Sequence, residues 1–166
     1  MKDLLSVAVL GSTGYVGLEL VKILIRHPNI EINFLGCENS PSKDIREFDK
    51  NIVTDSLPKL NLNHNFDPNN YDLVFLSLPH GVSHTLVKNY HNRIKIIDLS
   101  ADFRLDSKDL YSKNYNNEHA CPELLDQFVY GLPEINKNII NSNFDIAVPG
   151  CYPTSVLIPL VPLLDN

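Results

Sequence analysis

Residues 7–17 read Val-Ala-Val-Leu-Gly-Ser-Thr-Gly-Tyr-Val-Gly, an apolar run followed by three glycines. A wholly apolar run closed by glycine, as in residues 7–10, is typical of a strand buried on both faces of a parallel sheet. Apolar residues then recur at helical spacing over residues 15–26, and His27-Pro28-Asn29 predicts the end of that helix. Residues 30–35 predict a second strand. The sequence therefore opens with a strand–helix–strand crossover.

The rest of the chain continues this alternation. Residues 38–70 are rich in Asn, Asp, Ser and Pro, which predicts mostly irregular structure. Further strands are expected at residues 73–78, 94–99 and 144–148. Helices are expected at residues 82–90, near residues 122–126 and from Cys151 onward. The alternation predicts an α/β fold with a Rossmann-like, doubly wound and mostly parallel sheet.

The spacing of the three glycines, GxxGxxG, is related to the GxGxxG fingerprint of dinucleotide-binding folds. Gly11 permits a tight turn, Gly14 lets the backbone approach a pyrophosphate, and Gly17 allows close packing of helix on strand. The helix start adds free N–H groups and the positive end of the helix dipole. This context favours nucleotide binding over a glycine turn without a ligand. The cofactor contacts expected here are Gly11, Ser12, Thr13, Gly14, Tyr15, Val16 and Gly17.

The choice between NAD and NADP is expected to depend on the residues that follow the second strand. Glu38 favours NAD, because an acidic side chain at this place commonly accepts a hydrogen bond from the ribose 2′-hydroxyl. Ser40, Ser42 and Lys43 could instead receive a 2′-phosphate, which favours NADP. The residues alone leave both cofactors open.

Cys151 is the strongest candidate for a catalytic residue. It stands in Pro149-Gly-Cys-Tyr-Pro-Thr154, after an expected strand and at the first turn of an expected helix. The helix dipole and free N–H groups at such a place stabilise a thiolate and could also hold an oxyanion. A thiolate of this kind is suited to covalent catalysis on an acyl group. A small residue that fits a crowded turn is the weaker alternative.

A thiol nucleophile beside a nicotinamide site suggests a thioester and hydride transfer, a chemistry that also needs an acid/base group. His80 opens a helix near the expected cleft, and we expect it to line the site. His84 and His91 follow on that helix and are expected at the surface. None of the six histidines is a compelling base: His27, His64, His80, His84, His91 and His119.

Composition narrows the class of protein. The net charge of −6 over 166 residues, without a basic stripe, argues against nucleic acid as a partner. Three widely spaced cysteines without a CxxC pair predict neither disulfides nor a metal site, and they fit a reducing cytoplasm. Cys37 and Cys121 lack surroundings that would activate a thiol. The amino terminus has no signal-peptide pattern, and the apolar run at residues 156–164 is too short to span a membrane, so we expect a soluble, cytoplasmic protein.

The chain resembles the N-acetyl-gamma-glutamyl-phosphate reductases of arginine biosynthesis nearly from end to end. The resemblance rests on Gly11-Ser-Thr-Gly-Tyr-Val-Gly17, Leu76-Ser-Leu-Pro-His-Gly81, Asp98-Leu-Ser-Ala-Asp-Phe-Arg-Leu105, Val129-Tyr-Gly-Leu-Pro-Glu134 and Pro149-Gly-Cys-Tyr-Pro-Thr154. The first stretch is shared with aspartate-semialdehyde dehydrogenase and related reductases. The SADFRL, YGLPE and PGCYPT sequences within the last three stretches are more specific.

The resemblance implies NADPH as cofactor and reduction of N-acetyl-gamma-glutamyl phosphate to N-acetyl-L-glutamate 5-semialdehyde, with release of phosphate. Cys151 would displace the phosphate to form a thioester, which hydride then reduces. The further contacts implied are Leu78, Pro79 and His80 for the cofactor, and Ser100 and Arg104 for the substrate. Reduction of a related acyl phosphate (aminoadipyl or, less closely, aspartyl) stays open, as does a non-catalytic nucleotide-binding module.

Members of this family are much longer than this chain, and their later part supplies the catalytic histidine, most substrate contacts and a dimer-forming sheet. The resemblance therefore predicts an NADP-binding Rossmann-type domain at residues 1–148 and the beginning of a catalytic α+β domain at residues 149–166. It implies a homo-oligomer for the full-length enzyme. We expect the 166-residue chain to bind NADPH but to reduce no acyl phosphate by itself.

Overall fold

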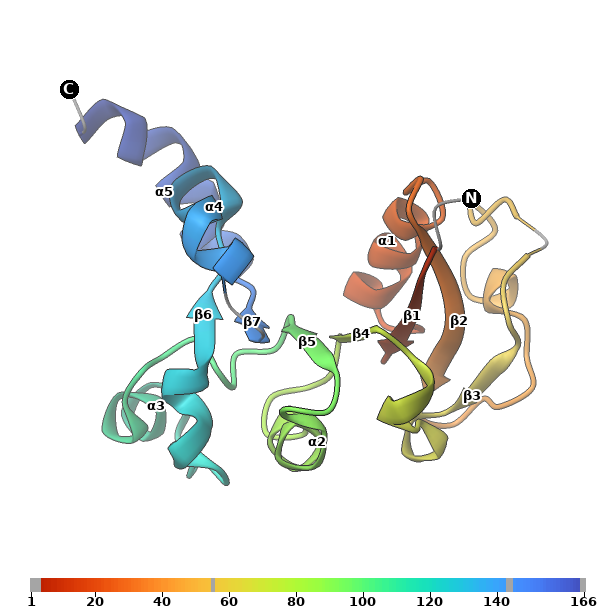
Figure 1. Ribbon diagram of the computed structural model, residues 1–166, viewed down its shortest axis with the longest axis horizontal. Helices are drawn as coiled ribbons and strands as arrows, with labels where there is room; N and C mark the ends of the chain where they lie inside the picture. The colour runs from red at the N-terminus through yellow and green to blue at the C-terminus, as the bar shows by residue number, and fades with distance from the viewer. Residues whose placement is uncertain (1–3, 55, 143–144, 165–166) are drawn as a thin grey trace. The chain divides into compact units, whose positions relative to one another are not determined.

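The computed structural model describes residues 4–54, 56–142 and 145–164 (Figure 1). The chain forms two compact units, each described here by itself. The first contains residues 1–78 and 92–96, and the second contains residues 79–91 and 97–166. Both contain parallel strands and helices, so the predicted α/β fold is confirmed.

The first unit is a parallel sheet with one crossover helix. Its strands, in the order β3-β2-β1-β4 across the sheet, are β3 (Leu60–Leu62), β2 (Ile30–Cys37), β1 (Leu5–Leu10) and β4 (Leu73–Leu76). β1 pairs in parallel with both β2 and β4. The helix α1 (Tyr15–Leu24) connects β1 to β2 and ends two residues before the predicted boundary. The predicted opening crossover is confirmed.

The core of the first unit forms around β1, because this strand is apolar on both faces. Its residues Val7, Ala8, Val9 and Leu10 are all 0% exposed. Burying a side chain the size of valine or leucine stabilises the fold by about 1.5–3 kcal/mol. Residues 38–70 are mostly irregular, as predicted, yet Ile45 and Ile52 from this polar stretch are buried in the same core. The strand β3 was not predicted, because three residues are too few to show a period.

The second unit contains three parallel strands and most of the helices. The strands, in the order β5-β7-β6, are β5 (Lys95–Asp98, the last two residues belonging to this unit), β7 (Asp145–Ala147) and β6 (Phe128–Tyr130). The helices are α2 (Ser83–Tyr90), α3 (Lys108–Tyr115), α4 (Pro133–Ser142) and α5 (Cys151–Leu164), with a 3₁₀ helix, η4, at Pro122–Gln127.

The elements of this unit with a clear pattern of apolar residues could be predicted from the sequence, and the others could not. The elements α2, β5, η4 and the start of α5 lie where the sequence predicts them. The strand β7 lies within the predicted strand at residues 144–148, whose first residue is outside the described ones. The elements α3, α4 and β6 were missed. The helix α3 is largely polar, although Ser107 caps its start and the left-handed Asn116 ends it.

No helix among the described residues combines the length and the apolar character needed to cross a membrane. The helix α5 is mostly apolar, yet none of its described residues is buried.

Candidate functional site

At two positions in the loop between β1 and α1, the backbone leaves room only for glycine. Gly11 has a φ of +73°, and a Cβ there would lie 2.1 Å from the carbonyl oxygen of Ser77. A Cβ at Gly17 would lie 2.3 Å from the Gly11 carbonyl oxygen, because α1 packs directly against the loop. Side chains at these positions would collide with the main chain, so Gly11 and Gly17 make the turn and the close helix packing possible.

The middle of this loop is open to solvent. Gly14 is the N-cap residue of α1 and has no side-chain cap, while Tyr15 and Val16 are exposed and Thr13 is half-buried. The first N–H groups of a helix have no partner within the helix. A Cβ at Gly14 would meet the Gly11 oxygen at 3.5 Å, an ordinary contact. The first turn of α1 thus has no side-chain cap and begins at an exposed glycine, an arrangement that fits the phosphates of a dinucleotide.

Residues from the ends of neighbouring strands hold the loop. Ser12 is buried, and its N–H and its hydroxyl both donate to the Gly36 carbonyl oxygen at 2.8 Å. Asn63, directly after β3, accepts a hydrogen bond from the Gly11 N–H at Oδ1 (3.1 Å). A Cβ at Gly36 would lie 2.3 Å from that same oxygen. Leu78 also lies beside the loop, since its Cδ2 would be 3.1 Å from a Cβ at Gly11.

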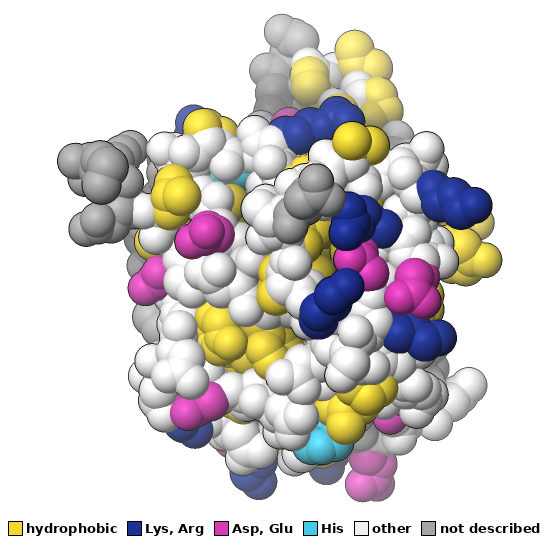
Figure 2. Space-filling model, turned by 90° about the vertical axis from the view of Figure 1, so that its right-hand side faces the viewer, with side chains coloured by type: hydrophobic (Ala, Val, Ile, Leu, Met, Phe, Trp, Pro, Cys, Tyr) yellow, Lys and Arg dark blue, Asp and Glu magenta, His cyan; other side chains and the backbone are white. Residues whose placement is uncertain are grey.

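The residues that bear on cofactor choice follow β2. Glu38 and Lys43 are exposed, and Ser40 is half-buried. On the face shown in Figure 2, basic and acidic side chains lie among one another rather than in separate fields. Because neighbouring charges of opposite sign neutralise one another, a bound anion depends on a basic side chain that is not already paired.

Ion pairs occupy two of the basic side chains near this stretch. Arg46 and Lys59 lie 2.8 and 3.0 Å from Oδ2 of Asp44. Hydrogen bonds from Arg46 and then Lys59 hold the pKa of the Asp44 carboxyl well below its usual range. Lys43 has no ion-pair partner among the described residues, and its Nζ lies over the Phe48 ring, 5.9 Å from the ring centroid.

In the second unit, Cys151 is the first residue of α5, and its thiol is exposed. The first turn is closed by the Thr154 N–H, which donates to the Gly150 carbonyl oxygen at 3.0 Å. An open cavity of about 470 Å³ is lined by Arg104, Leu105, Tyr115, Tyr130, Gly150, Cys151, Tyr152 and Pro153. This volume is in the range of small-molecule sites. No histidine lines the cavity in the part of the chain that the structure describes.

Arg104 joins the cavity to the ends of two strands. Its Nε donates to the Val148 carbonyl oxygen (2.7 Å), and its Nη2 donates to the Leu99 carbonyl oxygen (2.8 Å). A Cβ at Gly150 would lie 3.0 Å from Nη1, so the guanidinium lies directly against the turn before Cys151. The structure therefore brings Arg104 and Cys151 to one cavity. It also makes Arg104 a support for the backbone that carries the thiol.

The other residues implied by the resemblance lie outside that cavity lining. Pro79 and His80 are exposed, and His80 Nδ1 accepts a hydrogen bond from the Ala101 N–H at 3.2 Å. Ser100 is only 3% exposed. Its hydroxyl donates to Oδ2 of Asp98 (2.7 Å) and accepts from the Asp102 N–H (3.1 Å). In this structure Ser100 is part of a buried network rather than of an open site.

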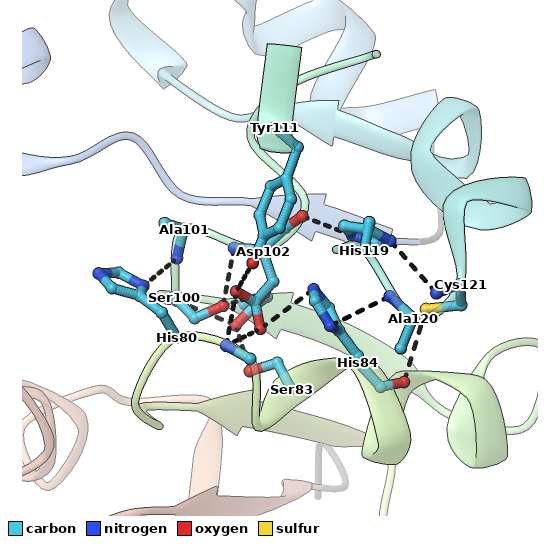
Figure 3. A network of polar contacts seen from close by, with 12 residues as sticks. His80, Ser83, His84, Ser100, Ala101, Asp102, Tyr111, His119, Ala120 and Cys121 are labelled. Atoms are coloured by element: carbon cyan, nitrogen blue, oxygen red, sulfur yellow. Dashed lines mark hydrogen bonds and ion pairs between the residues drawn. The ribbon is translucent and has the colours of Figure 1, made fainter. Parts of the chain in front are cut away.

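That network, drawn in part in Figure 3, contains two carboxylates and two histidines, all nearly or fully buried. Burial raises the pKa of Asp98 to about 6, although hydrogen bonds from Ser100 act the other way. Burial also lowers the pKa of His84 and of His119. Nδ1 of His84 accepts from the Ala120 N–H, and Nδ1 of His119 from the Cys121 N–H, each at 3.3 Å. Each neutral ring therefore carries its proton on Nε2.

The structure corrects two predictions made from sequence. His84 was expected at the surface but is 2% exposed, because the face of α2 that carries it packs against Phe103, Tyr111 and His119. His91 was also expected at the surface but is half-buried, with Nδ1 2.6 Å from Oδ2 of the buried Asp145. Partners from distant segments bury both rings.

The remaining cysteines and histidines offer no competing site. Burial raises the pKa of the Cys121 thiol to about 11, which disfavours its thiolate, and Cys37 is buried. His27 and His64 are exposed. Among the described residues no group of three or more His, Cys, Asp or Glu side chains could hold a metal ion.

We predict that Asp98 makes the free energy of unfolding fall as pH rises. Its folded pKa is raised above the unfolded value, so between about pH 4 and 6 the native state holds a proton that the unfolded state has lost. The stabilisation lost across this window is on the order of 2–3 kcal/mol. Asp98→Asn should remove this dependence. Urea unfolding of both proteins at pH 4.5, 5.5 and 7 measures the difference.

The two histidines act in the opposite direction, which is why the comparison uses a difference. Their lowered pKa values favour protonation of the unfolded state below about pH 6.5, so they destabilise the fold as pH falls. Both proteins share this contribution, and it cancels in the difference. Parallel pH profiles for wild type and Asp98→Asn would show that Asp98 is ionised throughout, against the prediction.

Comparison with known proteins assigns the chain to a protein family. A family model described as "Semialdehyde dehydrogenase, NAD binding domain" matches residues 6–143. The chain belongs to this family. The match includes the glycine loop, Arg104 and the buried network, and it ends before Cys151. The Rossmann-like fold and the oxidoreductase class predicted from sequence are thereby confirmed.

Curated relatives of this NAD-binding domain are named reductases. The N-acetyl-gamma-glutamyl-phosphate reductase of Ehrlichia canis (strain Jake) is 47% identical over 163 residues, which cover 96% of this chain and 46% of the relative. The probable N-acetyl-gamma-glutamyl-phosphate reductase, chloroplastic, of Oryza sativa subsp. japonica is 40% identical over 95% of this chain and 38% of its own length. The chain spans about half the length of the curated relatives it matches, or less.

Solved structures with a similar fold are semialdehyde dehydrogenases. Aspartate semialdehyde dehydrogenase II from Vibrio cholerae has a TM-score of 0.74 at 20% identity and covers 99% of this chain and 47% of that chain. The enzyme from Candida albicans, solved with NADP, has a TM-score of 0.67 at 18% identity, with 98% and 47% covered. At these identities the likeness concerns the fold.

Proposed function

We propose that this chain supplies the NADP(H)-binding domain and the nucleophilic thiol of an N-acetyl-gamma-glutamyl-phosphate reductase of arginine biosynthesis. The observation that carries the proposal is the exposed Cys151 thiol at the start of α5, in a cavity that it shares with Arg104. The names of relatives at 40–47% identity support the acetylglutamyl substrate over an aminoadipyl or aspartyl one.

The residues of the cavity suit attack on an acyl phosphate. The Cys151 thiolate attacks the acyl carbon, the bond from that carbon to the phosphate oxygen breaks, and a thioester forms. N–H groups at the start of α5 donate to the oxygen that becomes negative during the attack. Arg104, whose Nη1 lies against the Gly150 turn, is proposed to bind a phosphate or carboxylate of the substrate. NADPH, when bound, supplies the hydride that reduces the thioester.

We propose that the cofactor binds along the glycine loop, with its pyrophosphate over Gly14. The uncapped first turn of α1 and the absence of a Cβ at the exposed Gly14 fit this role. Lys43, exposed and without an ion-pair partner among the described residues, and Ser40 are proposed to bind the 2′-phosphate of NADP(H). The acidic Glu38 beside them would weaken but not reverse this preference.

We further propose a cytoplasmic enzyme whose partner is a small acyl phosphate and which assembles as a homo-oligomer at full length. A relative from rice carries the name chloroplastic. Because no histidine lines the Cys151 cavity among the described residues, we expect the 166-residue chain to bind NADPH without turnover.

One assay tests the proposal. The chain joined to the C-terminal half of the Ehrlichia canis relative should reduce NADP⁺ when N-acetyl-L-glutamate 5-semialdehyde and phosphate are both present. We expect kcat/KM for NADP⁺ to exceed that for NAD⁺ at least about tenfold, since one charge-assisted contact contributes about 1.5–3 kcal/mol. Lys43→Ala should remove most of this preference.

Lys59→Ala is the matched control, because it removes an exposed lysine that is already paired with Asp44. It should leave the ratio of NADP⁺ to NAD⁺ unchanged. No phosphate-dependent turnover by a joined protein that binds NADPH would refute the proposed reaction. A preference for NAD⁺ would refute the proposed cofactor and point to Glu38.

A further inference from the structure

Asp102 is a fully buried carboxylate that the proposed reaction does not use. It lies in the SADFRL segment between Ser100 and Arg104, and it is 0% exposed. A buried carboxylate is costly unless hydrogen bonds compensate its lost hydration. The contacts of Asp102 therefore indicate what keeps this residue in place.

The shortest hydrogen bonds of the Asp102 carboxylate come from a turn, whereas its carbonyl oxygen lies 2.7 Å from Nε2 of the buried His119. Both carboxylate oxygens of Asp102 accept from the Gly81 N–H at 2.9 Å. Gly81 has a φ of +82° and follows Pro79 and His80, which are both exposed. The Val82 N–H donates to the Pro79 carbonyl oxygen at 3.2 Å and closes the turn. The buried Asp102 carboxylate thus binds the N–H of Gly81, the last residue of the turn, while the preceding Pro79 and His80 are exposed.

One further donor binds the carboxylate, and a second lies nearby without forming a hydrogen bond. The Tyr111 hydroxyl donates to Oδ1 at 3.0 Å. Nε2 of His84, which carries the ring proton, lies 3.6 Å from Oδ2 and has no hydrogen-bond partner in the described part of the chain. The carboxylate therefore accepts hydrogen bonds from two separate segments of the chain, the turn at Gly81 and the helix α3 at Tyr111, and the His84 ring lies beside it.

The same turn leads to the proposed active site. His80 packs against Tyr115 with ring centroids 5.7 Å apart, and Tyr115 lines the Cys151 cavity. The Ala101 N–H, next to Asp102, donates to His80 Nδ1. Two adjacent residues of the SADFRL segment thus hold two adjacent residues of the turn.

We propose that Asp102 is a positioning residue, whose buried carboxylate fixes the Pro79-His80-Gly81 turn so that His80 stays against the wall of the Cys151 cavity. Its consequence for cofactor binding rests on the proposed function, because Pro79 and His80 are cofactor contacts only if the chain binds NADP(H). The anchoring of Gly81 does not rest on it.

The decisive variant is Asp102→Asn. Either orientation of the new amide points its NH₂ at a donor: at Gly81 and Tyr111 on one side, or at Gly81 and His84 on the other. We expect the Gly81 amide hydrogen of the 166-residue chain, followed by NMR, to exchange at least about tenfold faster than in wild type. We also expect the Kd for NADPH, measured by calorimetry, to rise at least about tenfold.

Tyr111→Phe is the matched control. It removes a donor from the same carboxylate and keeps the ring, so it should lower the midpoint of urea unfolding while Gly81 exchange and the NADPH Kd stay within about twofold of wild type. A structural role alone would make the two variants alike in all three measurements, and this result would overturn the proposal. Asp102→Asn with wild-type Gly81 exchange would overturn it as well.

The remaining outcomes are also decisive. If Asp102→Asn does not fold, wild-type exchange gives the answer: the Gly81 amide should be at least about tenfold better protected than the amide of His80, and equal exchange would contradict the anchoring. If wild type binds no NADPH, the proposed cofactor function fails, and Gly81 exchange still decides the role of Asp102.

Discussion

In the folded chain we expect iodoacetamide to modify one of the three cysteines, Cys151, and to leave the other two intact. The Cys151 thiol is exposed, whereas Cys37 is 1% and Cys121 0% exposed. A buried thiol reacts only when the structure around it opens, and the open fraction of a stable domain is on the order of 10⁻³ or less. The alkylation rates should therefore differ about 10³-fold. Peptide mass mapping over time measures all three.

Serine variants of Cys151 and Cys121 test whether the accessible thiol is also the nucleophile of the proposed reaction. Cys151→Ser should abolish the fast alkylation and, in the joined protein, lower phosphate-dependent turnover about 10³-fold or more, because a hydroxyl is a far weaker nucleophile than a thiolate. Cys121→Ser is the control and should leave both unchanged. Urea should make all three cysteines of wild type react. Fast alkylation that persists in Cys151→Ser would show that another thiol is open.

The sequence predicted those parts of the fold that show a local pattern of apolar and polar residues. The run at residues 7–10 is apolar whichever way its side chains point, so its burial on both faces could be predicted without knowing its neighbours. The helix α3 was missed because its sequence is largely polar; it remains in place through Tyr111, whose partners lie elsewhere in the chain. Ser107, which caps the start of α3, is a local feature that could have indicated this helix.

The residues of the site also divide into those that local sequence predicts and those that depend on distant contacts. Cys151 was found because the expected strand at residues 144–148 is followed directly by a Pro-Gly turn and a helix start. Asn63 and Asp102 were missed because the hydrogen bonds that reveal them join residues 52 and 21 positions apart. Asp102 had one accessible indication, its place within the SADFRL segment. His84 was misplaced for the same reason, since residues 103–119 bury it.

The glycine loop gives the second large effect. Gly11→Ala should destabilise the first unit by about 3 kcal/mol or more, because the new methyl group would meet the Ser77 oxygen at a φ that side chains rarely adopt. Gly14→Ala should change the free energy of unfolding by less than about 1 kcal/mol, since its φ of −74° suits alanine and its Cβ makes an ordinary contact. Urea unfolding measures both.

The two variants separate a glycine needed for folding from one needed for a ligand. Gly14→Ala leaves the fold intact but places a methyl group where the pyrophosphate would approach the backbone, so the Kd for NADPH should rise at least about tenfold. Gly11→Ala cannot make this distinction, because lost binding would follow from lost structure. A Gly14→Ala protein with wild-type stability and wild-type NADPH affinity would mean that the cofactor does not approach this loop. The uncapped first turn of α1 would then bind no phosphate, and the proposed cofactor site would have to be abandoned.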